Sequence, residues 1–227
     1  MTEPNLDWHS INTVLLDMDG TLLDLHFDNY FWLTHLPLRY AQAQKLSLPE
    51  AHTTINQLIT DQEGSLNWYC VDYWSETLGL DIGQLKEEVQ HLIAFRPYVE
   101  HFLQTLQETH HRVVLVTNAH RKSLNLKLRI TQLDRYFDAL ISSHDYGYPK
   151  EAQAFWHRLQ EEEPFDPDST LLIDDSLAVL ASAREYGIKN LLSIVQPDSQ
   201  KPERAISEYE AVNSFSSVKP TRKPNGF

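Results

Sequence analysis

Two aspartates stand directly after an apolar stretch near the start of the chain. Asp17 and Asp19 follow residues 13–16, whose β-favouring and apolar side chains predict a buried strand. Because side chains alternate along an extended backbone, both carboxylates project from the same side where the strand ends. Such carboxylates repel each other unless a divalent cation shares their charge, or one acts as nucleophile or base and the other as an acid. The alternative is that both only solvate the strand end.

A second acidic pair follows another apolar stretch late in the chain. Asp174 and Asp175 come directly after residues 170–173, which also predict a strand. Two adjacent acids at that position repel each other strongly unless a hard cation is bound. Mg²⁺ suits such a site because it takes oxygen ligands and bridges to substrate phosphate. A cap formed by Asp175 and Ser176 on the following helix is an alternative that is compatible with metal binding.

A threonine and a lysine complete the set of residues that could handle phosphate. Thr117 follows the predicted strand 112–116, and its hydroxyl and the next amides can bind phosphate oxygens. Lys150 ends a Gly-Tyr-Pro-Lys turn, where it could neutralise a phosphoryl oxygen and the charge of a nucleophile. The ordinary alternatives are a strand-ending threonine with Asn118 as a helix cap, and a solvated loop lysine.

The predicted elements fall into two different patterns. Behind the first strand, about seventy residues show only helical periodicity, with a break or kink predicted at Pro37 and a capping box at Ser47 and Glu50. The helices predicted there cover residues 27–44, 48–59, 66–78 and 81–94. From Arg96 onward, helices alternate with strands predicted at residues 112–116, 138–142, 170–173 and 190–195. This alternation predicts an α/β fold with a parallel sheet, whose ligands bind outside the carboxyl ends of the strands.

Composition narrows the kinds of molecule that the chain could bind and the compartment in which it could work. The chain has 227 residues and a net charge of −13, which argues against general affinity for nucleic acid or anionic membranes. Cys70 is its single cysteine, so an internal disulfide is excluded and a reducing compartment is the simplest location. The sequence shows neither a signal-like N-terminus nor a membrane-length apolar run. We therefore expect a cytoplasmic protein, and the sequence gives no prediction of its oligomeric state.

Four short motifs of the chain resemble those of the haloacid-dehalogenase-like superfamily, namely Asp17-x-Asp19-Gly20-Thr21, Thr117, Lys150 and Asp174-Asp175. Most members of that superfamily are Mg²⁺-dependent phosphatases. The resemblance implies a Rossmann-like parallel-sheet core with an inserted all-helical cap. It assigns residues 1–24 and 96–205 to the core domain and residues 25–95 to the cap domain. Residues 206–227 are left as a C-terminal tail, and the serine, lysine and proline content of residues 209–227 predicts poor order there.

Several further segments are similar to the bacterial GMP/IMP 5′-nucleotidases of this superfamily, namely residues 27–32, 66–70, 72–76, 117–120 and 147–151. This similarity implies hydrolysis of a small-molecule phosphomonoester, specifically a purine nucleoside 5′-monophosphate. A sugar-phosphate phosphatase or a phosphoglucomutase-like enzyme of the same superfamily is one alternative. A non-catalytic nucleotide-binding protein is another, although the intact acids argue against it.

The resemblance also implies a role for each motif residue. Asp17 would attack phosphorus to form an aspartyl-phosphate, and Asp19 would protonate the leaving alkoxide and then activate water. Thr117 and Lys150 would hold the transferring phosphoryl group. Mg²⁺ would be held by the Asp17 carboxylate, the Asp19 backbone carbonyl and Asp175, with Asp174 contributing directly or through water.

Substrate choice would fall to the helical insertion. We expect Asn118 from the core, with Asn67, Trp68 and Asp72 from the insertion, to contact substrate. The insertion is rich in aromatic residues on which a purine could stack, although most are expected to pack in the helical bundle: Phe27, Tyr30, Trp32, Trp68, Tyr69, Tyr73 and Trp74.

Cys70 is expected to be a buried structural thiol. The eleven histidines show no zinc-like spacing, and none is predicted to bind metal.

Overall fold

The computed structural model describes residues 3–221, and within them six parallel strands form one sheet in the order β3-β2-β1-β4-β5-β6. The strands are β1 (Thr13–Leu16), β2 (Arg112–Thr117), β3 (Ala139–Ser142), β4 (Thr170–Asp174), β5 (Asn190–Ile194) and β6 (Glu210–Val212). The predicted parallel α/β sheet is therefore confirmed. The first strand in sequence lies inside the sheet, between β2 and β4.

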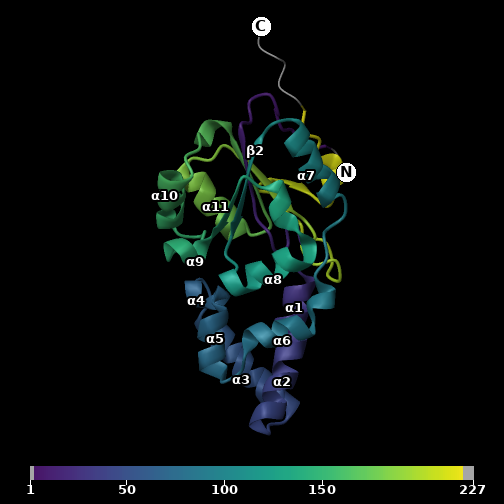
Figure 1. Ribbon diagram of the computed structural model, residues 1–227, viewed down its shortest axis with the longest axis vertical. Coiled ribbons are helices and arrows are strands. Elements are labelled where there is room, and N and C mark those ends of the chain that lie inside the picture. The colour runs from purple at the N-terminus through teal and green to yellow at the C-terminus, as the bar shows by residue number, and fades with distance from the viewer. Residues whose placement is uncertain (1–2, 222–227) are drawn as a thin grey trace.

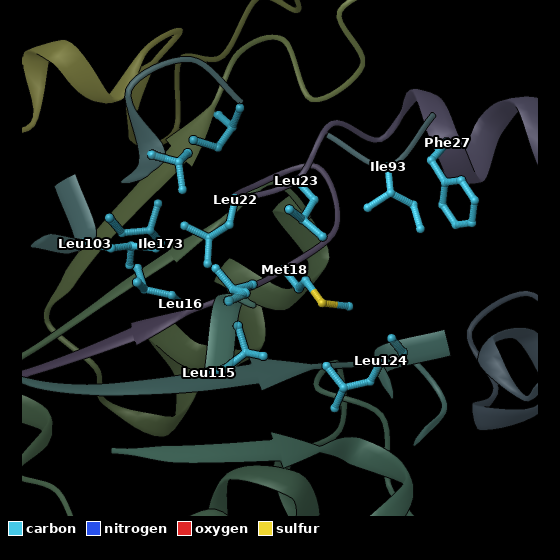
Figure 2. Packing of buried hydrophobic residues seen from close by; sticks show 14 of the residues in the cluster. Leu16, Met18, Leu22, Leu23, Phe27, Ile93, Leu103, Leu115, Leu124 and Ile173 are labelled. Carbon is cyan, nitrogen blue, oxygen red and sulfur yellow. The ribbon is translucent and has the colours of Figure 1, made fainter. Parts of the chain in front are cut away.

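Helices cover both faces of this sheet (Figure 1). They are α7 (Val99–Glu108), α8 (Arg121–Thr131), α9 (Ser143–Tyr146), α10 (Gln153–Glu162) and α11 (Leu177–Tyr186). Alternate residues of β1 face opposite sides: Leu16 packs in the layer with Leu103 of α7, whereas Leu15 packs with Trp156 of α10. Figure 2 shows the first layer, in which Leu16 lies near Leu115 and Ile173 of the neighbouring strands. Burial on both faces explains why these strands read as continuous apolar runs.

The segment between β1 and α7 is helical throughout its regular elements and forms a lobe beyond one edge of the sheet (Figure 1). It contains α1 (His26–Tyr30), a π-helical segment (Phe31–His35), α2 (Leu36–Gln44), α3 (Leu48–Asp61), α4 (Leu66–Tyr69), α5 (Val71–Leu78), α6 (Ile82–Glu88) and a 3₁₀ turn (Gln90–Leu92). Its two connections lie side by side, because the amide of Asp24 bonds to Ala94 and that of Arg96 bonds to Leu22, each at 2.9 Å. We call residues 25–95 the helical insertion.

Three of the helices predicted in the insertion differ from those observed, and the one predicted over residues 81–94 ends at Glu88 as α6, before the 3₁₀ turn. Pro37 stands in the first turn of α2 and has no amide hydrogen to donate to the preceding turn. The helix is π-helical just before this position, over Phe31–His35. The single helix predicted over residues 66–78 is two helices, because Cys70 has an extended backbone and caps α5. The capping box of Ser47 and Glu50 is confirmed, and Gly79 ends α5 in a left-handed conformation.

The prediction of poor order over residues 209–227 is wrong for the part of that range that the structure describes. Residues 210–212 form β6, which pairs in parallel with β5 at the sheet edge. Val212, Phe215 and Val218 are buried in the core layer that also contains Phe102. Three apolar side chains spaced three apart supply enough buried surface to order a segment that is otherwise rich in serine and lysine. Residues 222–227 lie outside the described residues.

Among residues 3–221, every helix is too short or too polar to cross a membrane.

Candidate active site

The carboxyl ends of β1, β2 and β4 open onto a cavity of about 380 Å³ that is closed on its other side by the helical insertion. The register of the three strands explains why their carboxyl ends meet at one cavity. Leu16 is level with Leu115 on one side and Ile173 on the other, so the three strands end within two residues of one another. The predicted site residues that line this cavity are Asp17, Asp19, Trp68, Thr117, Asn118, Lys150, Asp174 and Asp175.

Lys150 stands at the centre of the acidic residues. Its Nζ lies 2.6 Å from Asp17 Oδ1, 2.7 Å from Asp174 Oδ2 and 3.0 Å from the carbonyl oxygen of Val116. Burial alone would lower the pKa of Lys150, but the two carboxylates raise it above its usual range. The lysine is therefore a fixed positive charge. Asn118 Oδ1 accepts the Lys150 amide at 2.9 Å and fixes the turn that carries it.

The carboxylates of Asp17, Asp174 and Asp175 outnumber the lysine. Each offers an oxygen within 4.8 Å of the others, and Asp17 Oδ2 is buried without a hydrogen-bond partner in the described chain. Burial raises the pKa of Asp17 to about 6 and that of Asp175 well above its ordinary value, and mutual repulsion adds to both effects. Three hard oxygen donors with an uncompensated negative charge fit a divalent cation such as Mg²⁺.

Gly20 permits the close approach of Asp175 to the first acid pair. Its φ is +88°, and a Cβ built at Gly20 would lie 2.8 Å from the carboxyl carbon of Asp175. Both the backbone conformation and the space therefore require glycine. This contact between Gly20 and Asp175 is not predicted from the sequence.

A second buried chain of charges begins at Asp19. Lys127 Nζ of α8 lies 2.6 Å from Asp19 Oδ1 and 2.7 Å from Asp28 Oδ2 of α1, and Lys86 Nζ of α6 lies 2.7 Å from Asp28 Oδ1. Burial raises the pKa of Asp19 to about 6, against the opposing effect of Lys127. An acid with this pKa can both donate and accept a proton near neutral pH. The chain of charges also crosses from the core into the insertion.

Sequence reasoning missed Asp28, Lys86 and Lys127. A signal was present, because Lys127 lies on the helix face that also buries Leu124, and Lys86 lies four residues after the buried Ile82. Lysine on an apolar helix face is rarely fully buried without a partner. Periodicity shows that such a lysine is unusual, but only the fold identifies its partner on another helix.

The structure separates the predicted substrate contacts of the insertion. Trp68 lines the cavity with Tyr69 and Trp32, whereas Phe27 and Trp74 are buried in the core. Tyr69 also donates a 2.9 Å hydrogen bond to Glu151, a residue that accepts a second one from Asn118.

Asn67 and Asp72 do not line this cavity. Asn67 is exposed and donates to Gln62 at 3.2 Å, and Asp72 pairs with Lys122 at 2.6 Å. Both residues lie on helices next to the cavity, but their side chains have other partners. The structure therefore does not bring them together with the core motif residues.

Comparisons with known proteins agree with this architecture. Residues 14–192 match the family model described as haloacid dehalogenase-like hydrolase. The chain is 41% identical over 217 residues to the GMP/IMP nucleotidase YrfG of Escherichia coli, covering 96% of this chain and 98% of that one. It is 25% identical to the pyrophosphatase PpaX of Anoxybacillus flavithermus, covering 79% of this chain and 82% of the relative.

Solved structures share the fold. A HAD phosphatase from Thermococcus onnurineus superposes with a TM-score of 0.77 at 21% identity, covering 92% of this chain and 96% of that chain. An L-2-haloacid dehalogenase from Xanthobacter autotrophicus superposes with a TM-score of 0.57 at 16% identity, covering 82% and 78% of the two chains. The family model spans most of the chain, and the acids, threonine and lysine of the motifs meet in one cavity. The protein therefore belongs to the haloacid dehalogenase-like hydrolase family.

Proposed function

We propose that this hydrolase is a Mg²⁺-dependent 5′-nucleotidase that acts on purine nucleoside monophosphates such as GMP and IMP. The observation that carries the proposal is one cavity with Asp17, Asp19, Thr117 and Lys150 on one wall and aromatic side chains on the other. Phosphatase chemistry is supported by the Asp19 carboxyl, because a departing halide needs no proton whereas an alkoxide does. The substrate class is supported by the 41% identical relative, whose name specifies GMP and IMP.

We assign the cation to Asp17 and Asp175, with the backbone carbonyl of Asp19 as a further ligand. Both oxygens of Asp174 already have partners, since Oδ2 accepts Lys150 at 2.7 Å and Oδ1 accepts the Ser176 amide at 2.8 Å. Asp174 would therefore contribute mainly by placing Lys150. Bound here, Mg²⁺ would offset carboxylate charge and polarise the substrate phosphate.

The residues of the chain then divide the reaction between them. An Asp17 carboxylate oxygen would attack phosphorus in line and form an aspartyl-phosphate, while the P–O5′ bond breaks. Asp19 would give its proton to the departing O5′ oxygen and later take one from the water that attacks phosphorus. Thr117 and Lys150 would hold the equatorial phosphoryl oxygens, where charge stabilisation supplies most of the rate enhancement.

We further propose that the helical insertion acts as a cap that selects the nucleoside. Trp68 and Tyr69 have nearly parallel rings, with centroids 6.2 Å apart and an interplanar angle of 25°, and both line the cavity opposite the acids. Flat purine bases stack well on such aromatic faces. Trp32 and Asn29 of the insertion line the same wall.

The test is a phosphate-release assay with Mg²⁺ over nucleoside monophosphates and sugar phosphates. We expect the highest kcat/KM with GMP and IMP, no activity after metal removal by EDTA, and background activity in Asp17→Asn with an unchanged circular dichroism spectrum. A flat response over purines and sugars would contradict the substrate class. Retained turnover in Asp17→Asn would remove Asp17 as nucleophile. The cytoplasmic location expected from the single cysteine remains a prediction.

A further inference from the structure

Three potential soft-metal ligands meet outside the reaction cavity. Cys70, His120 and His144 each offer a sulfur or ring nitrogen within 4.8 Å of the other two, and none of them lines the cavity described above. They come from three distant segments. Cys70 lies between α4 and α5 in the insertion, His120 precedes α8, and His144 lies in α9. Figure 1 shows α4 next to α9, where the helical lobe meets the sheet.

The ring of His144 is arranged like that of a metal ligand. Its Nε2 atom is buried and has no hydrogen-bond partner within the described residues. The ring also lies close enough to the backbone carbonyl of Asn118 to hydrogen-bond with it, and Nδ1 is the nitrogen left for that contact. A proton on Nδ1 leaves the Nε2 lone pair available, which is the usual way in which a backbone carbonyl orients a metal-binding histidine. The buried lone pair is otherwise unexplained.

The other two side chains complete a three-ligand set once His120 Nδ1 releases the amide of Lys122, which it accepts at 3.3 Å, so that Nε2 can bind a metal. Cys70 Sγ accepts the amide of Tyr73 at 3.4 Å from the N-cap position of α5, so the sulfur is fixed at the start of that helix. The His120 ring lies edge-on to the His144 ring, with centroids 4.9 Å apart. Asp72 Oδ2 lies 3.7 Å from His120 Nε2, so a carboxylate stands beside the cluster.

We propose that Cys70, His120 and His144 bind one Zn²⁺ ion. A thiolate and two imidazoles are typical zinc ligands, whereas Mg²⁺ prefers oxygen, so this site and the carboxylate site would select different metals. Three protein ligands leave a fourth position for water, or for Asp72 after a small movement. The sequence shows no zinc pattern because the three ligands are distant along the chain and meet only in the fold.

A metal at this position would join the helical insertion to the core. His120 and His144 follow β2 and β3, whereas Cys70 directly follows Tyr69, which lines the reaction cavity. Zinc binding would therefore hold the insertion against the sheet edge that carries Thr117 and Asn118. This inference does not depend on the proposed nucleotidase activity, because it rests on residues outside the catalytic cavity.

The test uses Co²⁺ as a spectroscopic probe on the metal-free full-length protein, with excess Mg²⁺ present to occupy carboxylate sites. A cobalt–thiolate bond gives an intense charge-transfer absorption in the near ultraviolet, and Cys70 is the only cysteine that can produce it. We expect this absorption to saturate at one Co²⁺ per chain and to disappear when Zn²⁺ is added. Absence of the band in the folded wild-type protein would overturn the proposal.

Matched variants identify the ligands. Cys70→Ser should lose the band completely, and His120→Gln and His144→Gln should each weaken Co²⁺ binding at least tenfold. His91→Gln removes an exposed imidazole of the same insertion and should bind Co²⁺ like the wild type. A band of unchanged affinity after loss of both His120 and His144 would show adventitious binding to the thiol and overturn the site.

Thermal unfolding provides a second readout that does not depend on the spectrum. Zn²⁺ should raise the Tm of the metal-free wild-type protein and of His91→Gln, because an ion that binds only the folded state stabilises it. The same addition should raise the Tm of His144→Gln by clearly less, because that variant binds the ion more weakly. An equal rise in all three proteins would place the zinc elsewhere and contradict the proposal.

Discussion

The sheet edge and the helical insertion form opposite walls of one cavity, but they are built on different principles. At the sheet edge, short strands in fixed register place Asp17, Thr117 and Asp174 by backbone geometry alone. In the insertion, the cavity-lining residues Asp28, Trp68 and Lys86 depend on how separate helices pack. The sheet wall can therefore keep the same catalytic residues in place. The residues that the insertion presents to the cavity change whenever one of its helices is altered. Variants on the two walls should differ accordingly.

On the core wall, Asp19→Asn should lower kcat for GMP by about 10²–10⁴-fold, because general acid–base catalysis contributes that much. The loss should be much smaller in the first step with p-nitrophenyl phosphate, whose leaving group needs no proton. Rapid-quench measurement of product release with both substrates checks this difference. Equal losses with both leaving groups would mean that Asp19 is not the acid.

Across the two walls, Asp28→Asn should reduce the free energy of unfolding by about 3–5 kcal/mol, since it leaves two buried lysines without their shared partner. Glu87→Gln is the matched control. Its partner Arg129 also joins the insertion to the core at 2.8 Å, but both side chains are about half exposed, so the change should cost about 0–1 kcal/mol. Urea unfolding distinguishes them, and equal costs would show that the buried chain of charges adds no special stability.

On the insertion wall, Trp68→Ala should raise KM for purine nucleotides roughly 5- to 150-fold, because stacking on a base is worth about 1–3 kcal/mol. The KM for a sugar phosphate should change little. Trp74→Ala serves as the contrast. Trp74 is 1% exposed and its removal should mainly destabilise the fold, by about 3–5 kcal/mol. Steady-state kinetics and unfolding curves separate these outcomes, and an equal KM rise for both substrates would remove Trp68 from base recognition.

The last expected effect concerns Mg²⁺ binding at the sheet wall of the cavity. Gly20→Ala should weaken Mg²⁺ activation about 10- to 100-fold, since its methyl group would displace Asp175. Gly79→Ala places the same methyl group at a positive φ with nothing within 4 Å, so it should lower stability without changing the Mg²⁺ requirement. Activity titrated against Mg²⁺ measures both, and identical activation curves would separate Gly20 from the metal.

The two walls also differ in how much the sequence predicted. Strands β1, β2 and β4 are predicted closely because each is a short apolar run followed by a polar residue that could take part in catalysis, such as Asp17. The burial of Lys86 and Lys127 was missed because helical periodicity does not reveal partners on other helices. The break at Cys70 and the strand at residues 210–212 were missed because both depend on tertiary contacts that override local preference.

In the proposed mechanism, the phosphoryl group passes through the Asp17 carboxylate before it reaches water. The most direct test is the stereochemistry at phosphorus, measured with a nucleoside monophosphate analogue whose thiophosphoryl group is made chiral by oxygen isotopes and hydrolysed in isotopically labelled water. Two successive in-line displacements predict net retention of configuration. Net inversion would show a single direct attack by water and would contradict the role assigned to Asp17.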